Sequence, residues 1–459
     1  MTFAPSSFRD PDARVLAVDG GRVVRVLSAR AAAADAALRA NGLLDELVRD
    51  RLLVPSAPTR DVTIPDGWAA AIESPRLPFV SYPYEWSFGM LQDAALLTLR
   101  LSERLLERGV MLKDASAYNV LFDGAAPLFV DVASLAPYEE NAPWAAYGQF
   151  CDHFLAPLML EAYRGVRFQP ALRGSLEGLS VTDQLAPLLT VADLWRPGVL
   201  VHVKARALLD RRTRRLATSL RREVRRAAVP KAAVLRNLQG LHRIVSRLRS
   251  RTPSVWAEYD AANTYDAATL ERKTTFVAAA CERLGGGRLA WDVGANTGRY
   301  SRVLAERYRC VVAMDADAGA VDRLYRSVHG TPAARAIVPL VADLMDPSPA
   351  RGWRGRERAA LTERGQPDLA LYLALVHHLC LGRGVPLDDF LDLACATSPA
   401  SVIEFVAADD PMSQAILATK EAAHPGYDLA AFRTLATRRG RIAAETAVSP
   451  TRHLFLLTR

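Results

Sequence analysis

Closely spaced cysteines are missing from this sequence of 459 residues. Its five cysteines lie far apart, at Cys151, Cys281, Cys310, Cys380 and Cys395. None forms a C-x-x-C pair, and the number is odd. The pattern therefore predicts neither a disulfide framework nor a zinc site, and a reducing cytoplasm is the compartment that fits it.

Long apolar runs are missing as well. No uninterrupted apolar stretch approaches the roughly 18 residues that a membrane-spanning helix needs. The first ten residues also lack the basic region and apolar core of a secretion signal. We therefore expect a soluble, cytoplasmic protein with no membrane partner.

The positive charge of the chain is concentrated in one segment. Between Lys204 and Arg251 there are 16 Lys and Arg residues against Asp210 and Glu223, a local net charge of +14 in a chain of net charge +8. Leucines recur at helical spacing, so we predict a basic helical linker over residues 201–252. Such a segment could bind RNA phosphates or an acidic lipid surface. A solvated helix pair that joins two domains is the favoured interpretation, because no aromatic residues alternate with the arginines.

The N-terminal part has a mixed pattern. Residues 13–27 contain two β-branched runs around a central Asp-Gly-Gly turn, which predicts a hairpin. Apolar stripes predict helices over 31–53 and 89–108, and residues 144–200 also have a helical pattern. The chain exceeds the length of a usual single core, so we predict an α+β N-terminal domain over residues 1–200.

One stretch of this N-terminal part carries polar groups at a suggestive spacing. Asp114, Asn119 and Asp131 follow one another around a short predicted hairpin. The stretch resembles the catalytic segment of protein kinase-like folds, in which these positions would be the base and two metal ligands. Leu112 stands where those families usually have His, and no glycine-rich phosphate loop precedes it. The alternatives are a degenerate kinase-like module and an ordinary turn in which the side chains bind backbone groups.

Residues 289–301 organise the C-terminal part. A short apolar run ends at Asp292, two glycines follow at Gly294 and Gly298, and a helical pattern then begins. This order predicts a strand, a glycine turn and a helix whose exposed N–H groups can approach a polar ligand. Three further apolar runs end at Asp315, at Asp343 and at the pair His377-His378, which predicts polar groups at the carboxyl edge of a parallel sheet.

These residues as a set resemble the class I S-adenosylmethionine (SAM) dependent methyltransferases. The resemblance implies a Rossmann-like α/β domain over residues 253–459, with a seven-stranded, mostly parallel sheet. By the resemblance SAM is the cofactor: its methionine part lies at the turn, its ribose is bound by the acid of the second strand, and its adenine amine by the acid of the third. Those roles fall on Asp292, Gly294, Asn296 and Gly298, on Asp315, and on Asp343.

The fourth strand bears on the type of reaction. It lacks the Asn/Asp-Pro-Pro-aromatic motif of enzymes that methylate the exocyclic amines of nucleic-acid bases, and this absence argues against a nucleic-acid partner. His377 or His378 could deprotonate an acceptor hydroxyl or amine, because the usual pKa of histidine is close to neutral pH. Both could instead be capping or buried structural residues, and many methyl transfers need no base.

Four further residues are candidates for binding the acceptor. Tyr259 and Tyr265 could contact the methyl sulfonium by cation–π attraction, or could pack against the sheet. Trp353 lies among four arginines that could hold an anionic acceptor or lie on the surface. Glu404, at the end of the fifth strand, could bind an acceptor cation or only receive a backbone donor.

A narrower resemblance covers most of the chain. The segments 293–298 and 374–379, with 114–131 upstream, look like a bacterial group that includes nodulation-type host-specificity methyltransferases. We therefore predict methylation of an oxygen or nitrogen of a small molecule or peptide in bacterial specialised metabolism, with the N-terminal module holding the acceptor. An RNA methyltransferase and a kinase-like ATP-binding protein are the alternatives, and homo-oligomerisation stays open.

Overall fold

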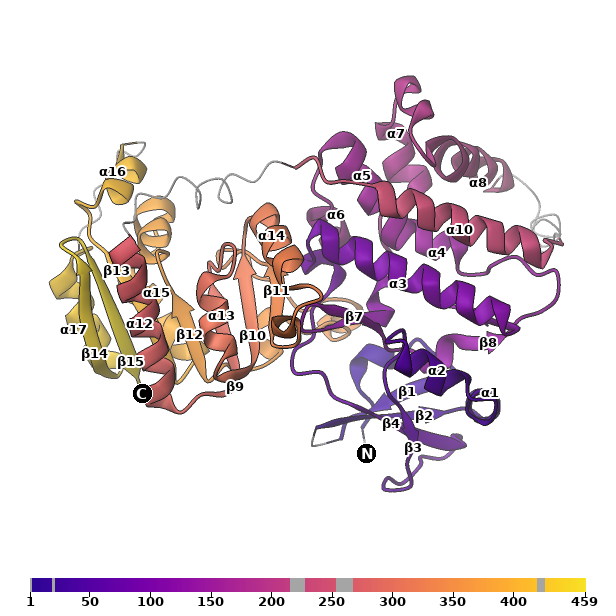
Figure 1. Ribbon diagram of the computed structural model, residues 1–459, viewed down its shortest axis with the longest axis horizontal. Helices are drawn as coiled ribbons and strands as arrows, with labels where there is room; N and C mark the ends of the chain where they lie inside the picture. Colours follow the sequence, from indigo (N-terminus) through magenta and orange to yellow (C-terminus); the bar gives the residue numbers. More distant parts are fainter. Residues whose placement is uncertain (1, 19–20, 215–227, 253–266, 419–425) are drawn as a thin grey trace. The chain divides into compact units, whose positions relative to one another are not determined.

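The computed structural model describes residues 2–18, 21–214, 228–252, 267–418 and 426–459. The chain divides into two compact units (Figure 1). The N-terminal unit comprises Met1–Asp123, Pro127–Pro253 and Ala350–Ala359, and the C-terminal unit comprises Gly124–Ala126, Ser254–Pro349 and Ala360–Arg459. Within the described residues, no helix has both the length and the apolar character needed to cross a bilayer.

The N-terminal unit begins with an antiparallel sheet of strand order β1-β2-β4-β3. The hairpin predicted over 13–27 is present as β1 and β2, and Val24 and Val26 of β2 point into the core of this sheet. The predicted helix over 31–53 is two helices instead of one, because Gly42 adopts a left-handed conformation (φ +74°) that ends the first. These elements are β1 Ala13–Leu16, β2 Arg22–Leu27, β3 Ala57–Pro58, β4 Ala70–Pro75, α1 Ala29–Ala40 and α2 Leu43–Arg49.

A long buried helix, α3 (Phe88–Glu107), is central to the rest of this unit. Ser87 caps its N-terminus by accepting a hydrogen bond from the backbone N–H of Met90. The amphipathic helix α10 (Lys231–Arg247) packs against α3 and buries Val234, Leu238, Leu241 and Val245. The Gln92 amide donates hydrogen bonds of 2.7 and 3.0 Å to the carbonyls of Val245 and Leu248.

The segment predicted as a basic linker over residues 201–252 therefore lies within the N-terminal unit wherever it is described. In α10 the arginines lie on the outside while the leucines and valines that face α3 are buried, which a charge count cannot reveal. The other elements of the unit are two short strand pairs and a series of helices. They are β5 Val110–Leu112 with β8 Leu135–Pro137, β6 Val120–Asp123 with β7 Ala126–Phe129, α4 Tyr147–Phe150, α5 Ala156–Arg164, α6 Gln169–Gly174, α7 Ala186–Leu188 and α8 Arg206–Arg214.

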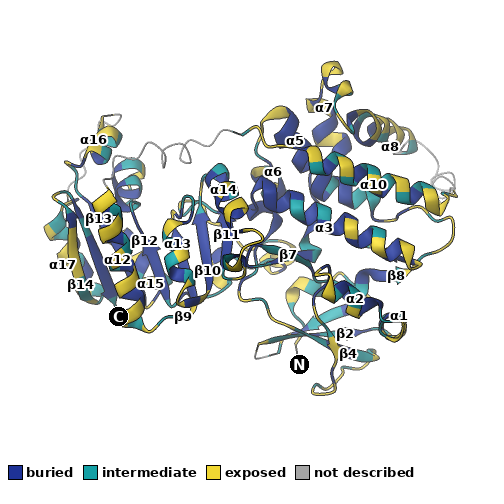
Figure 2. Cartoon of the chain, viewed as in Figure 1, coloured by how far each residue is buried: buried dark blue, intermediate teal, exposed yellow. Residues whose placement is uncertain are grey.

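The C-terminal unit contains a sheet of seven strands in the described residues, in the order β11-β10-β9-β12-β13-β15-β14. The first five strands are parallel, and β15 pairs antiparallel with both β13 and β14. The central strands are buried, as Figure 2 shows, which explains their continuous apolar runs. The strands are β9 Gly287–Val293, β10 Tyr308–Asp315, β11 Ile337–Val341, β12 Leu369–Tyr372, β13 Ala400–Val406, β14 Arg441–Ser449 and β15 Arg452–Thr458.

Helices precede the first strand and supply most of the crossovers between the parallel strands. They are α12 Ala267–Leu284, α13 Arg299–Ala305, α14 Ala318–Val328, α15 Leu387–Thr397, α16 Pro411–Leu417 and α17 Leu429–Arg439. The strand order reverses between β9 and β12, because β10 lies on one side of β9 and β12 lies on the other. A crevice at the carboxyl ends of these strands is the place where open α/β sheets bind ligands.

Candidate active site

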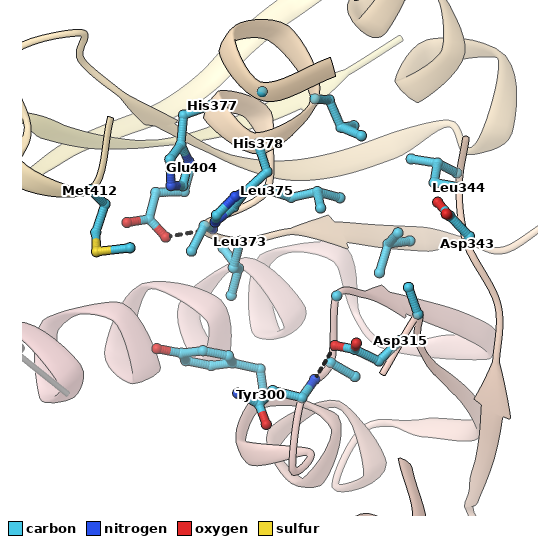
Figure 3. A pocket seen from close by; sticks show the side chains of 18 of the residues that line it. Tyr300, Asp315, Asp343, Leu344, Leu373, Leu375, His377, His378, Glu404 and Met412 are labelled. Carbon is cyan, nitrogen blue, oxygen red and sulfur yellow. Dashed lines mark hydrogen bonds between the residues drawn. The ribbon is translucent and has the colours of Figure 1, made fainter. Parts of the chain in front are cut away.

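A cavity of about 440 Å³ lies at the carboxyl ends of the parallel strands of the C-terminal unit (Figure 3). Its lining comes from Val293–Thr297 after β9, from Asp315 and Ala316 at the end of β10, from Ala342–Met345 after β11, and from Leu373–Leu375 after β12. Residues from α12, α13, β13, α16 and β15 complete the lining. Its volume lies within the range that is usual for small-molecule sites, about 300–1,000 Å³.

The turn between β9 and α13 passes along this cavity. Gly294, Asn296 and Gly298 all have positive φ angles, of 78°, 48° and 79°. Gly294 and Asn296 line the cavity, whereas Gly298 begins α13 and is packed against Leu324. A Cβ at position 298 would lie 2.4 Å from the Cδ1 atom of Leu324. The second glycine therefore serves close helix packing, and the first allows the chain to turn beside the cavity.

We expect Gly298→Ala to lower the free energy of unfolding by about 2–4 kcal/mol, because it combines an unfavourable φ with overpacking. Gly330→Ala is the matched control, since Gly330 also has a positive φ (76°) but no atom within 4 Å of its added Cβ. Urea denaturation of both variants measures the two effects separately. Equal losses of stability in the two variants would contradict a packing role for Gly298.

Asp315 and Asp343 lie at the cavity as predicted. The two oxygens of Asp315 accept hydrogen bonds from the backbone N–H groups of Asn296 (2.9 Å) and Asp317 (2.8 Å). Burial raises the pKa of the Asp315 carboxyl above its usual value. Asp343 accepts a hydrogen bond of 2.9 Å from the backbone N–H of Met345. Asp315 also has a backbone hydrogen bond with Ala316 and lines the cavity, where its carboxylate can accept a further hydrogen bond.

Asp292 is placed differently from the prediction. It does not line the cavity; its side chain is buried (2% exposed) and accepts a hydrogen bond of 2.6 Å from the hydroxyl of Ser301 in α13. Burial raises the pKa of this carboxyl to about 6. In this structure Asp292 therefore connects β9 to α13, and Gly298 likewise lies outside the lining.

A buried ionic network lies at the other end of the cavity from Asp315. Lys273 of α12 contacts both oxygens of Glu404, at 2.7 and 2.8 Å. Arg452 of β15 donates two hydrogen bonds of 2.8 Å to Asp410 and lies 3.3 Å from Glu404. All four residues are at most 6% exposed. Two positive and two negative charges thus compensate each other away from water.

The carboxylate oxygens of Glu404 are bonded within this network and to the backbone. Its Oε2 atom accepts a hydrogen bond of 2.9 Å from the N–H of Ala374, a residue with a positive φ of 49° (Figure 3). The prediction that Glu404 binds an acceptor cation is therefore not supported, because Lys273 and Arg452 already neutralise it. Its alternative, that it receives a backbone donor, agrees with the structure. Glu404 fixes the turn that follows β12.

The two histidines lie on a helical segment and not at the end of the strand. β12 ends at Tyr372, and the π-helical segment η12 (His378–Gly382) starts directly after His377. Both histidines line the cavity, with ring centroids 4.2 Å apart. His377 is 1% exposed, and its Nδ1 atom has no hydrogen-bond partner among the described residues. Burial lowers the pKa of His377 to about 2, so this ring is neutral at working pH.

We expect His377 to make the protein less stable as the pH falls below about 6.5. The unfolded chain binds a proton at this histidine below its usual pKa, while the folded chain binds none until about pH 2. Stability is therefore lost progressively on acidification, by up to about 1.4 kcal/mol per pH unit. Urea denaturation between pH 7.5 and 4.5 should give a shallower dependence for His377→Gln than for the wild type. Parallel curves would show that the ring is solvated.

The remaining predicted acceptor residues do not meet at the cavity. Trp353 is 67% exposed, lies in the part of the chain assigned to the N-terminal unit and does not line the cavity. Tyr259 and Tyr265 lie outside the described residues. The sequence reasoning missed Lys273, Tyr300, Met412 and Arg452, which line the cavity. A signal existed for Lys273, because it interrupts the apolar stripe of α12 at a position that helical spacing places inside.

The two carboxylates of the kinase-like stretch in the N-terminal unit have internal partners, whereas the buried Nδ2 atom of Asn119 has no hydrogen-bond partner among the described residues. Asp131 accepts a hydrogen bond from Ser134, and its Oδ1 atom lies 3.7 Å from the guanidinium of Arg25. Asp114 accepts a 2.8 Å bond from the N–H of Ser116, and burial raises its pKa. No group of three or more acidic, histidine or cysteine side chains suited to a metal ion occurs in the described parts of the chain. The turn interpretation therefore accounts for these contacts.

The C-terminal unit has the architecture of a Rossmann-like methyltransferase: a mostly parallel sheet, a glycine turn after its first strand, and a cavity at the reversal of strand order. The chain is 33% identical over 444 residues to nodulation protein NoeA of Rhizobium meliloti (strain 1021). The aligned region covers 95% of this chain and 91% of NoeA. It therefore belongs to the family of nodulation protein NoeA. No protein-family model matches the sequence.

Solved structures similar to this chain include several methyltransferases. The bifunctional kinase-methyltransferase WbdD matches with a TM-score of 0.32 and 18% identity, over 48% of this chain and 46% of WbdD. The N-methyltransferase NodS from Bradyrhizobium japonicum matches with a TM-score of 0.31 and 12% identity, over 42% of this chain and 97% of NodS. Magnesium protoporphyrin IX methyltransferase from Synechocystis, with bound SAM, matches with a TM-score of 0.30 and 15% identity, over 44% of this chain and 89% of that protein. Similarity at this level specifies neither the ligand nor the reaction.

Proposed function

We propose that this protein is a SAM-dependent methyltransferase that transfers a methyl group to an oxygen or nitrogen of a small-molecule or peptide acceptor. The observation that carries the proposal is the cavity at the carboxyl ends of β9–β12, with the glycine turn on one side and Asp315 and Asp343 beside it. The family relationship to a nodulation protein supports a role in bacterial specialised metabolism.

The residues of this cavity fit SAM in kind and in position. The Asp315 carboxylate can accept a hydrogen bond from a ribose hydroxyl, and the turn at Gly294 leaves room for the methionine part. Asp343 and Leu344 lie beyond Asp315 on the neighbouring strand, where an adenine can be held by a hydrogen bond and by apolar contact. When bound, SAM supplies an electrophilic methyl group on a positively charged sulfur.

The ionic network and the histidines define the acceptor end of the same cavity. The neutral ring of His377 lines this end of the cavity beside His378, where it can contact the acceptor and so orient the nucleophile. With its pKa lowered to about 2, this ring is a poor base at neutral pH, so its role is to position the acceptor. Glu404 supports this arrangement through the backbone of Ala374.

Calorimetric titration of the purified protein with SAM, with its demethylated product and with Mg-ATP tests the proposal. We expect micromolar dissociation constants for the first two ligands, and methyl transfer from radiolabelled SAM to a fraction of bacterial metabolites. Absence of SAM binding, together with ATP binding lost in Asp131→Ala, would refute it and move the chemistry to the N-terminal unit.

A further inference from the structure

Six of the large apolar side chains that the described N-terminal unit exposes fall between residues 191 and 209, and none of the six lines the cavity of the proposed methyl transfer. Trp195 is 92% exposed and Val191 is 80% exposed, values that are unusual for such side chains. Leu200, Val201, Leu208 and Leu209 are between 53% and 62% exposed. We call these six residues the apolar surface. A group of exposed apolar side chains on packed elements marks an interaction site more often than a free face.

The six residues lie on consecutive, packed elements. Val191 and Trp195 are in the 3-10 helix η7 (Val191–Trp195), which packs against the π-helical segment η8 (Val199–Ala205). The segment η8 ends at Ala205 and α8 starts at Arg206, so the helical stretch is continuous. Figure 2 shows exposed residues around α7 and α8. On α8, Leu208, Arg211 and Arg212 are exposed at spacings of three and four residues, so they share one face of that helix.

The opposite face of this helix is firmly attached to the unit. Val199 and Val203 are fully buried, and His202 makes a 2.8 Å hydrogen bond to the hydroxyl of Tyr147 through its Nδ1 atom. Lys204 donates hydrogen bonds of 2.8 and 2.6 Å to the carbonyls of Ala186 and Leu189. The helix is thus held in place by one side, while the apolar surface faces water.

Positive charge without compensation accompanies the apolar surface. The acids on the packed elements have internal partners: Asp193 lies 2.8 Å from Arg196, and Asp210 accepts a 2.8 Å bond from Thr182. Asp183, an exposed acid of the neighbouring segment η6 (Val181–Leu185), accepts a 3.4 Å hydrogen bond from the hydroxyl of Ser180. Arg211 and Arg212 are exposed and form no hydrogen bond or ion pair with any described residue.

We propose that the apolar surface docks this protein onto a bilayer that contains anionic lipids. Exposed aliphatic side chains with a tryptophan can enter the headgroup region, and adjacent arginines bind the phosphates. A second copy of the chain would bring the same uncompensated arginines together, and an RNA would leave the aliphatic side chains without a partner. The helix lies on the membrane surface, which differs from the expectation that the protein has no membrane partner.

Cosedimentation of the full-length protein with vesicles tests this inference. Vesicles of phosphatidylcholine with about 30% phosphatidylglycerol should bind the protein, and binding should weaken as salt is raised from about 50 to 500 mM. Trp195→Ala and Leu208→Ser should each weaken binding about tenfold. Loss of one positive charge in Arg211→Ala or Arg212→Ala should weaken it about fivefold. All four positions are exposed, so the fold should tolerate these changes.

Matched controls distinguish binding through the apolar surface from nonspecific binding to vesicles. Trp353→Ala removes another exposed tryptophan of the same unit, and Arg438→Ala removes another exposed arginine, so both should bind like the wild type. No binding to anionic vesicles, or equal binding to neutral ones, would overturn the proposal. Concentration-dependent self-association that Trp195→Ala abolishes, without vesicle binding, would overturn it in favour of a protein interface.

Discussion

Replacement of Asp315 by alanine should reduce the affinity for SAM about a hundredfold. The carboxylate would lose a hydrogen bond to the ribose that involves a charged group and is worth about 1.5–3 kcal/mol. The variant would also remove the partner of the Asn296 N–H, which helps to hold the glycine turn in place. Calorimetric titration of Asp315→Ala with SAM and with its demethylated product measures the loss directly.

The control for this variant is Asp409→Ala. Asp409 is an exposed carboxylate of the same unit that does not line the cavity, so its removal should leave SAM binding unchanged. Urea denaturation of both variants shows whether the fold is retained. If a folded Asp315→Ala protein binds SAM as tightly as the wild type, Asp315 does not bind the ribose.

Replacement of Lys273 by methionine should destabilise the C-terminal unit by about 3–5 kcal/mol. This change keeps the apolar stem but leaves Glu404, which is fully buried, without its closest positive charge. Breaking one side of a buried ion pair costs more than the pair contributes, because an uncompensated charge then stays in a medium of low dielectric constant. Thermal or urea unfolding detects a change of this size easily.

Two comparisons make this test specific. Lys231→Met changes an exposed lysine at the start of α10 and should leave stability nearly unchanged. The double variant Lys273→Met/Glu404→Gln removes both charges, so it should be more stable than Lys273→Met alone. If the single variant loses less than about 1 kcal/mol, or if the double variant is less stable than the single one, the network does not compensate its charges as described.

The sequence alone predicted the C-terminal fold well, for a physical reason. Strands that are buried on both faces have continuous apolar runs, and a glycine turn has few chemical solutions, so both features are visible locally. The positions of Asp315 and Asp343 followed from the same rule, because residues at the carboxyl ends of parallel strands meet at one edge of the sheet. NoeA family membership agrees with the resemblance drawn from these motifs.

Packing between distant elements was decided only by the tertiary structure. Lys273, Glu404, Asp410 and Arg452 are far apart in the chain and meet because α12, β13, α16 and β15 converge on one end of the cavity. This convergence neutralises Glu404 and buries His377, whose local sequence suggested a cation site and a base. Asp292 has the spacing of a ligand-binding residue, yet it lies beneath the turn and bonds to Ser301.

In the basic segment, too, the sequence and the tertiary structure determined different features. Its charge and its leucine spacing were fixed by composition and period, and both predicted a helix with arginines on its outer faces. Which leucines are buried depends on a partner helix that the local sequence does not specify. Helix α10 packs against α3 and buries its apolar stripe. Leu208 and Leu209 of α8 pack against no such helix in the described chain and are exposed. Sequence periodicity thus determines the elements and the polar ends of the strands. Tertiary packing decides which charges are neutralised and which apolar faces are left for another molecule, because both depend on neighbours that are distant in sequence.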